Sequence, residues 1–175
     1  MDTNQIAHAL LSDNFTKTSF QGVFPSDTLR ELQPNYPCSL VINLDPSHLP
    51  GSHWVAVFIS KEGHGEYFDS YGLPPSTVSA ISTFMNRVCI QHCYNEKTLQ
   101  SLFSDVCGHY VIFYLLHKNR GCKMETIKSW FSSKPDVNDR MVYEFISKYF
   151  PCIAEGYRDV DVGTQTAVAR GRRGF

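Results

Sequence analysis

The sequence has no apolar run close to the ~20 residues needed to cross a bilayer, and its first residues carry an acid where a secretory signal carries base. We therefore expect a cytosolic or nuclear protein with no membrane partner. The chain also lacks an excess of either charge, since 16 Lys and Arg nearly balance 17 Asp and Glu, for a net charge of -1. This balance gives no reason to expect nucleic acid as a partner.

Metal-binding cysteine patterns are missing as well. The six cysteines contain no Cys-x-x-Cys pair, and Cys89 with Cys93 has no second ligand pair at zinc-finger spacing. We therefore expect no metal site and no cofactor. Because the chain has no export signal and enough apolar residues for a core, it needs no disulfide framework, and free thiols are expected.

What the sequence does contain is apolar material for one core. At 175 residues and 42% hydrophobic content, a single domain is expected, and we place it at residues 1–154. Residues 155–175 have no periodic apolar face and finish in the basic run ARGRRGF. They are predicted to form a flexible basic tail.

Apolar periodicity predicts an α+β fold. Strand-like runs are rich in β-branched and aromatic residues, whereas helical stretches repeat apolar residues every three to four positions. Residues 15–37 hold several turn-forming residues and are expected to wrap the surface around one short helix, 27–32. The expected strands are 38–43, 54–60, 66–70 and one within 89–99, and the other expected helices are 1–13, 78–88, 107–116, 124–131 and 137–149. A small, mostly antiparallel sheet follows from the short link between the second and third strands.

Cys107 is the candidate nucleophile. It lies where the polar loop SLFSD meets an apolar helical run, which places its sulfur in the first turn, near the positive end of the helix dipole. This position favours the thiolate, and the Cys107 amide is free to face a developing oxyanion. Gly108 permits close approach of a substrate backbone. Periodicity alone equally allows an inert buried cysteine.

His53 and Asp69 are candidates for the base and its orienting acid. A thiol becomes a strong nucleophile when a histidine accepts its proton and a third group fixes the histidine tautomer. His53 opens an apolar strand after a Pro-Gly-Ser turn, and Asp69 ends the neighbouring strand. Taken singly, each also reads as an ordinary turn residue.

Three segments together resemble a known family. GSHWVAVFI, YFDSYG and QSLFSDVCGHYVIFYLL are similar to the signature blocks of the adenovirus-protease (adenain) and SUMO-protease-like cysteine peptidases. Within that family, FQGVFPSDTL is similar to the adenain-like proteases of Polinton or Maverick transposons. The resemblance implies a papain-like fold in which the Cys107 helix packs against the sheet. It also implies catalytic roles for His53, Asp69 and Cys107.

The same resemblance implies roles for two more residues. Gln100 would supply its side-chain amide as the second oxyanion donor, and its spacing of seven positions from Cys107 (107 minus 100) is that of the adenovirus enzyme. Trp54 would form the cleft wall beside the thiol. Asp69 departs from the adenovirus pattern, which has glutamate, and matches the SUMO-protease branch.

The resemblance leaves three functions open. One is an endopeptidase that cleaves Gly-containing sites in precursor proteins of a virus-like element and is itself packaged in virus-like particles. The second is an isopeptidase that removes a ubiquitin-like modifier. The third is a catalytically silent protein-binding module. An activating peptide, either separate or the tail ARGRRGF itself, is an expected partner by the same resemblance, although the tail also reads as a solvated basic end.

Overall fold

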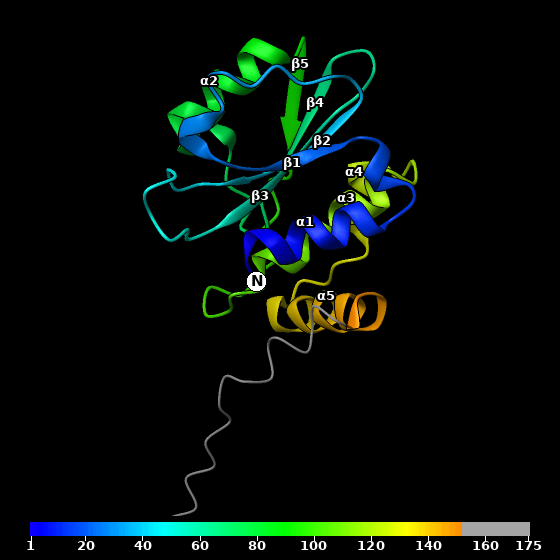
Figure 1. The fold of residues 1–175 in the computed structure, drawn as a ribbon. Helices are drawn as coiled ribbons and strands as arrows, with labels where there is room; N and C mark the ends of the chain where they lie inside the picture. The colour runs from blue at the N-terminus through cyan, green and yellow to red at the C-terminus, as the bar shows by residue number, and fades with distance from the viewer. Residues whose placement is uncertain (152–175) are drawn as a thin grey trace, which may run out of the picture.

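The protein, described by a computed structural model over residues 1–151, has one five-stranded sheet with helices on both faces (Figure 1). The helices are α1 (Thr3–Ser12), α2 (Ser79–Val88), α3 (Cys107–Lys118), α4 (Met124–Ser129) and α5 (Pro135–Tyr149). The strands are β1 (Phe20–Pro25), β2 (Cys38–Asn43), β3 (Trp54–Ile59), β4 (His64–Phe68) and β5 (Gln91–Tyr94). The predicted tail lies outside the described residues. Within residues 1–151, no helix has the length and apolarity to span a membrane.

The sheet has the order β1-β2-β3-β4-β5. Its centre is the antiparallel arrangement predicted from sequence, with β3 between β2 and β4. β3 and β4 form the expected hairpin, whose turn uses Gly63 at a positive φ of 80°. The two edge strands β1 and β5 each pair parallel to their neighbours. The predicted α+β class is confirmed.

The segment 15–37 differs from its prediction. Phe20–Pro25 is an edge strand rather than surface loop, and the short helix predicted at 27–32 is only a 3-10 turn, Ser26–Thr28. The sequence pattern did not indicate β1, because this strand contains Gly22 and Pro25, two residue types that usually interrupt strands. Gly22 lies at a register irregularity, and Pro25 ends a strand at the sheet edge, where a missing N–H costs no ladder hydrogen bond.

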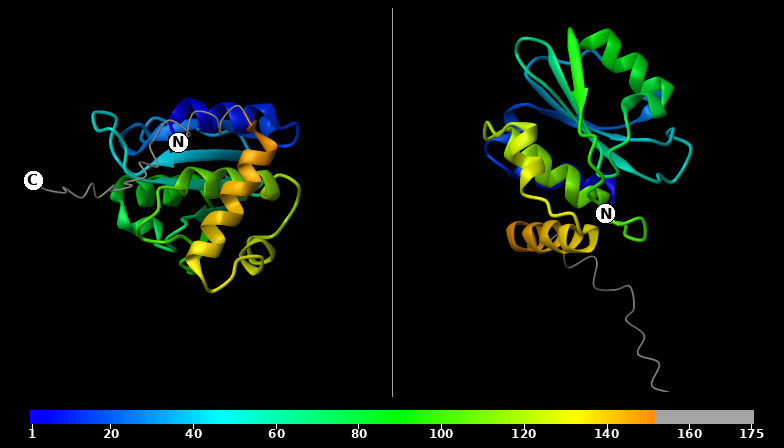
Figure 2. Two further views of the ribbon diagram at one scale, coloured as in Figure 1. Left: turned by 90° about the horizontal axis from the view of Figure 1, so that it is seen from below. Right: turned by 180° about the vertical axis from the view of Figure 1, so that it is seen from behind.

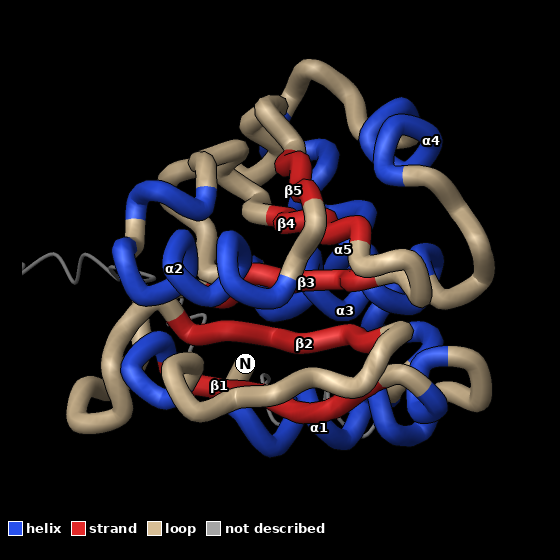
Figure 3. Tube along the Cα trace, turned by 90° about the horizontal axis from the view of Figure 1, so that it is seen from above, coloured by secondary structure: helices blue, strands red, loops and turns tan. Residues whose placement is uncertain are grey.

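Both faces of the sheet are covered. Along β2, Leu40 and Ile42 pack in the cluster that contains α2, while Val41 packs in the cluster that contains α1, α3 and α5. Figure 3 shows α2 on one side of the strands and α3 on the other. A strand covered on both faces has no need of polar residues, which is why β2 reads as an apolar run rather than an alternation.

Helix α3 is surrounded by protein. Its residues from Cys107 to Leu116 are all buried, because α1 lies beside it, β3 lies under it and α5 crosses its outer side (Figure 2). The helix is also tied to β4, since the Tyr114 ring stacks on Phe68 at 4.3 Å. Tyr114 and Lys118 both donate hydrogen bonds to the Glu66 carboxylate, at 2.5 and 2.6 Å.

The first prediction concerns α5, which covers α3. Ile146 is 1% exposed in the core, whereas Tyr149, one turn later, is 61% exposed. Ile146→Ala should lower the free energy of unfolding by about 2–5 kcal/mol, because it leaves a cavity against α3, and Tyr149→Ala should change it far less. Urea unfolding of both variants measures this. Equal effects would contradict the burial of Ile146 in the core.

Candidate active site

Cys107 is the first residue of α3, as predicted. Its thiol is almost fully buried, and its own amide sits at the first helical position, where it has no intrahelical partner. The preceding carbonyl of Val106 accepts from the amides of His109 and Tyr110, which fixes the first turn. The sulfur therefore lies at the positive end of a 12-residue helix.

His53 and Asp69 meet at the ends of two neighbouring strands. His53 directly precedes β3 and Asp69 directly follows β4. The His53 Nε2 lies 2.8 Å from Asp69 Oδ1, and both side chains are buried. Because Asp69 occupies Nε2, the other ring nitrogen, Nδ1, is the one left for Cys107, which is close enough to raise the pKa of His53. The structure thus brings the three predicted residues together.

The pKa of His53 reflects both neighbours. Burial lowers the pKa of the imidazolium, but the hydrogen bonds to Asp69 and Cys107 and the negative charges of these two groups outweigh burial and raise it to about 9. At neutral pH the ring is therefore protonated. An imidazolium beside a cysteine favours the thiolate, which is the nucleophilic form of that side chain.

The Asp69 carboxylate is held by backbone as well as by His53. Its Oδ1 also accepts from the Tyr71 amide at 2.8 Å, and the Tyr71 ring stacks on the His53 ring at 4.7 Å. Asn95, which follows β5 and is fully buried, brackets the Asp69 backbone. The Asp69 amide donates to Asn95 Oδ1 at 2.7 Å, and Asn95 Nδ2 donates to the Asp69 carbonyl at 2.6 Å. The orientation of the acid is therefore fixed on every side except Oδ2.

Gln100 is buried and its amide is oriented by two neighbours. Its Nε2 donates to the Ser104 carbonyl at 2.8 Å, and its Oε1 accepts from the Ser70 hydroxyl at 2.6 Å. A side-chain NH₂ has two donors, so one N–H remains for another acceptor. Gln100 is joined to the site through Ser70, which follows Asp69, and through Ser104, which lies in the loop that leads to Cys107.

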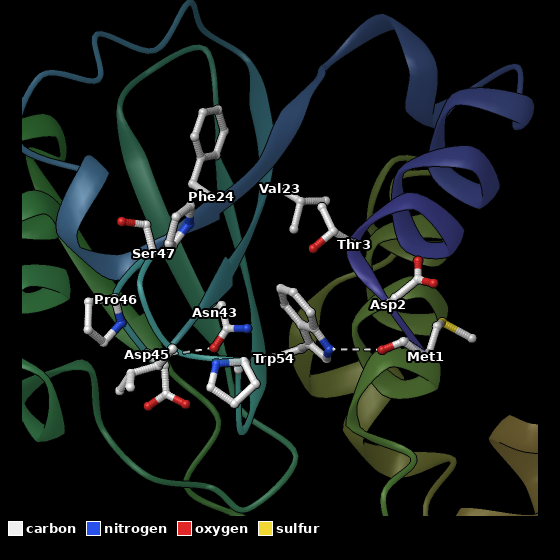
Figure 4. Close-up of a pocket in the computed structure, with 14 residues that line it drawn as sticks. Met1, Asp2, Thr3, Val23, Phe24, Asn43, Asp45, Pro46, Ser47 and Trp54 are labelled. Atoms are coloured by element: carbon white, nitrogen blue, oxygen red, sulfur yellow. Dashed lines mark hydrogen bonds between the residues drawn. The ribbon is translucent and has the colours of Figure 1, made fainter.

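Trp54 and Gly108 lie next to the N-terminal residue. Trp54 donates from Nε1 to the Met1 carbonyl at 3.3 Å, and a Cβ atom placed on Gly108 would lie 3.1 Å from the Met1 side chain. Trp54 also lines a cavity of about 310 Å³. Figure 4 shows the indole between Asn43 and Asp45 on one side and Met1 and Asp2 on the other.

The loop between Gln100 and Cys107 carries two exposed apolar residues at its tip. Leu102 is 78% exposed and Phe103 is fully exposed. The tip is anchored by a turn in which the Ser104 amide and hydroxyl both donate to the Ser101 carbonyl, at 3.2 and 3.1 Å. Exposed aromatic and aliphatic side chains on an ordered turn are typical of a surface that contacts another protein.

The structure offers no competing metal centre in its described part. Within residues 1–151, no three His, Cys, Asp or Glu side chains gather as metal ligands would. The cysteines of this range are free thiols, namely Cys38, Cys89, Cys93, Cys107 and Cys122. Cys93 is exposed on the edge strand β5, away from any partner thiol.

Sequence reasoning missed three residues of this site: Ser70, Tyr71 and Asn95. The first two stand directly after Asp69 in the block YFDSYG, so the spacing could have suggested Ser70 and Tyr71 as neighbours of the acid. Asn95 is far from the acid in the chain and reaches it only because β5 pairs with β4. No local pattern marks it.

Comparison with known proteins finds one curated relative of this chain, a viral cysteine protease. No family model matches the chain. Cysteine protease S273R of African swine fever virus (isolate Tick/Malawi/Lil 20-1/1983) is 27% identical over an alignment that covers 65% of this chain and 45% of the viral protein. The chain thus spans less than half the length of this relative.

Solved structures agree on the fold. The crystal structure of the African swine fever virus pS273R protease superposes with a TM-score of 0.50 at 18% identity, covering 79% of this chain and 64% of that one. The central domain of Lpg1148 from Legionella pneumophila, an uncharacterized protein, gives a TM-score of 0.50 at 12% identity over 89% of this chain and 98% of the domain. The chain therefore shares its α+β fold with a viral cysteine protease.

The second prediction concerns the charge that holds His53. Asp69→Asn removes the negative charge beside the ring, so the pKa of His53 should fall from about 9 by at least about one pH unit. Titration of the histidine Cε1 proton by NMR measures it. Among the other histidines, His109 titrates far below His53, because burial and the charge of the N-terminus lower its pKa to about 4.

Asp139→Asn is the matched control. This carboxylate accepts from Tyr110 and Ser101 and is not among the groups that shift His53, so the pKa of His53 should stay near 9 in this variant. An unchanged pKa in Asp69→Asn would show that Asp69 does not control the imidazole.

Proposed function

We propose that this protein is a cysteine peptidase with Cys107 as nucleophile, His53 as general base and acid, and Asp69 as the residue that orients His53. The observation that carries the proposal is the buried hydrogen bond between Asp69 and His53, next to the Cys107 thiol at the start of a helix. A structural histidine has no need of both a buried carboxylate and a thiol. The similarity to a viral cysteine protease supports it.

The proposed cycle uses these groups in order. The Cys107 thiolate attacks the scissile carbonyl carbon, and the oxyanion is held by the Cys107 amide and the remaining N–H of Gln100. Protonated His53 gives its proton to the leaving amine, which departs and leaves a thioester on Cys107. His53 then takes a proton from water, which hydrolyses the thioester, and the thiolate is restored.

The third prediction tests whether Cys107 is activated by His53. Iodoacetamide at pH 7 should alkylate Cys107 rapidly in the wild type. The rate at Cys107 should fall by at least about tenfold in His53→Ala, because the thiolate loses its counter-ion. Peptide mass spectrometry of the time course reports each cysteine separately.

Two variants serve as controls. His48→Ala removes an exposed histidine five positions earlier, and Cys93→Ser removes an exposed thiol. Neither should alter alkylation of Cys107. Equal rates at Cys107 in the wild type and His53→Ala would instead support the reading of this protein as a catalytically silent binding module.

Two substrate classes fit the site. The first is Gly-containing sites in precursor proteins of a virus or virus-like element, supported by the viral relative and by the little space that Met1 leaves beside Gly108. The second is the tail of a ubiquitin-like modifier. Exposed Leu102 and Phe103 favour a folded substrate, since they offer apolar surface to a protein partner in the loop between Gln100 and Cys107.

The fourth prediction separates these classes. If the protein matures precursors, linear peptides that contain Gly-Gly should be cleaved with a kcat/KM equal to or above that for ubiquitin, SUMO or NEDD8 carrying a C-terminal aminomethylcoumarin. A preference of about 100-fold or more for a folded modifier would identify a deconjugating isopeptidase. Cys107→Ala controls for contaminating proteases in both assays.

The remaining expectations about partners and location stay proposals. The tail ARGRRGF as an activating peptide lies outside the described residues. The adenain-like branch and packaging in virus-like particles rest on the sequence resemblance. The proposed chemistry needs none of these features, because every group in the cycle belongs to residues 53–107.

A further inference from the structure

The orientation of the Gln100 amide decides whether it stabilises or destabilises an oxyanion. With Nε2 toward the cleft it donates an N–H, whereas a rotation of half a turn about the last side-chain bond would present Oε1, which repels negative charge. The Ser104 carbonyl accepts only from Nε2, and the Ser70 hydroxyl donates to Oε1. The Ser104 carbonyl, which only accepts, therefore selects the orientation, and the Ser70 hydroxyl holds the other end of the amide in place.

Ser70 is built into this position. It is fully buried, and its carbonyl accepts from the amides of Leu99 and Gln100 at 2.8 and 3.0 Å. The hydroxyl that meets Oε1 thus belongs to the residue that also fixes the Gln100 backbone. Ser70 follows Asp69 directly in the chain. The Asp69 side chain contacts the base His53, whereas the Ser70 side chain contacts the oxyanion donor Gln100.

We propose that Ser70 is a positioning residue that holds the Gln100 amide with its N–H toward the oxyanion. This inference rests on the proposed peptidase function and adds to it a residue that touches neither substrate nor the reacting atoms. Without the hydroxyl, Oε1 loses its partner in a buried site, and the amide is held at one end only, by the Ser104 carbonyl. Ser70→Ala should therefore weaken the step in which an oxyanion forms.

The fifth prediction tests Ser70 with the full-length protein and N-benzyloxycarbonylglycine p-nitrophenyl ester, an activated ester that needs little recognition. Ser70→Ala should lower the acylation rate constant by at least about tenfold, and Gln100→Ala by on the order of 10² to 10³. In the double variant, Ser70→Ala should cost nothing further, because its effect passes through Gln100. If Ser70→Ala lowers the acylation rate constant by the same factor with and without Gln100→Ala, the proposal is wrong.

Alkylation separates positioning from damage to the fold. Reaction of Cys107 with iodoacetamide forms no oxyanion, so Ser70→Ala should alkylate at the wild-type rate while its acylation falls. Ser39→Ala is the matched control, since Ser39 is equally buried and bonded to Ser19 and Asn119. It should leave acylation unchanged.

The outcomes divide cleanly. If Ser70→Ala alkylates as slowly as His53→Ala, Ser70 supports the whole site rather than Gln100, and the proposal is wrong. If the wild type shows His53-dependent alkylation but never acylates, no oxyanion hole operates, which also overturns it. If alkylation of the wild type does not depend on His53, the peptidase function itself fails.

Discussion

The hydrogen bond between His53 and Asp69 depends on the register of β3 and β4, and the rest of the site is arranged around that register. Ala56 pairs with Phe68, and the antiparallel count continued past the strand ends sets His53 opposite Tyr71. The Tyr71 ring accordingly stacks on His53, and Asp69 reaches the ring from the same edge. A slip of one residue would turn the acid away from the base.

Coverage of the sheet on both faces shields the buried groups of this site from water. Because α2 packs on one face and α3 on the other, His53 and Asp69 are buried at strand ends that would otherwise be open to water. Low local polarity strengthens the attraction between imidazolium and its anionic neighbours. The pKa of His53 is raised because that attraction exceeds the penalty of burying the imidazolium.

Sequence reasoning found the groups that carry chemistry and missed those that support them. Cys107, His53 and Asp69 stand at element boundaries, where a change in periodicity is visible in the chain. Strand β1 was concealed because Gly22 and Pro25 are tolerated only by virtue of a bulge and an edge position, both of which are properties of the sheet. Asn95 is brought to the acid by the β4–β5 pairing, and no run of adjacent residues encodes that proximity.

Glu66 gives α3 a second fixed point on β4. The first is the stacking of Tyr114 on Phe68, and the second is the pair of hydrogen bonds that Tyr114 and Lys118 donate to the Glu66 carboxylate. The helix that begins with Cys107 and the strand that Asp69 follows are thus joined to each other by contacts that involve neither of these two residues.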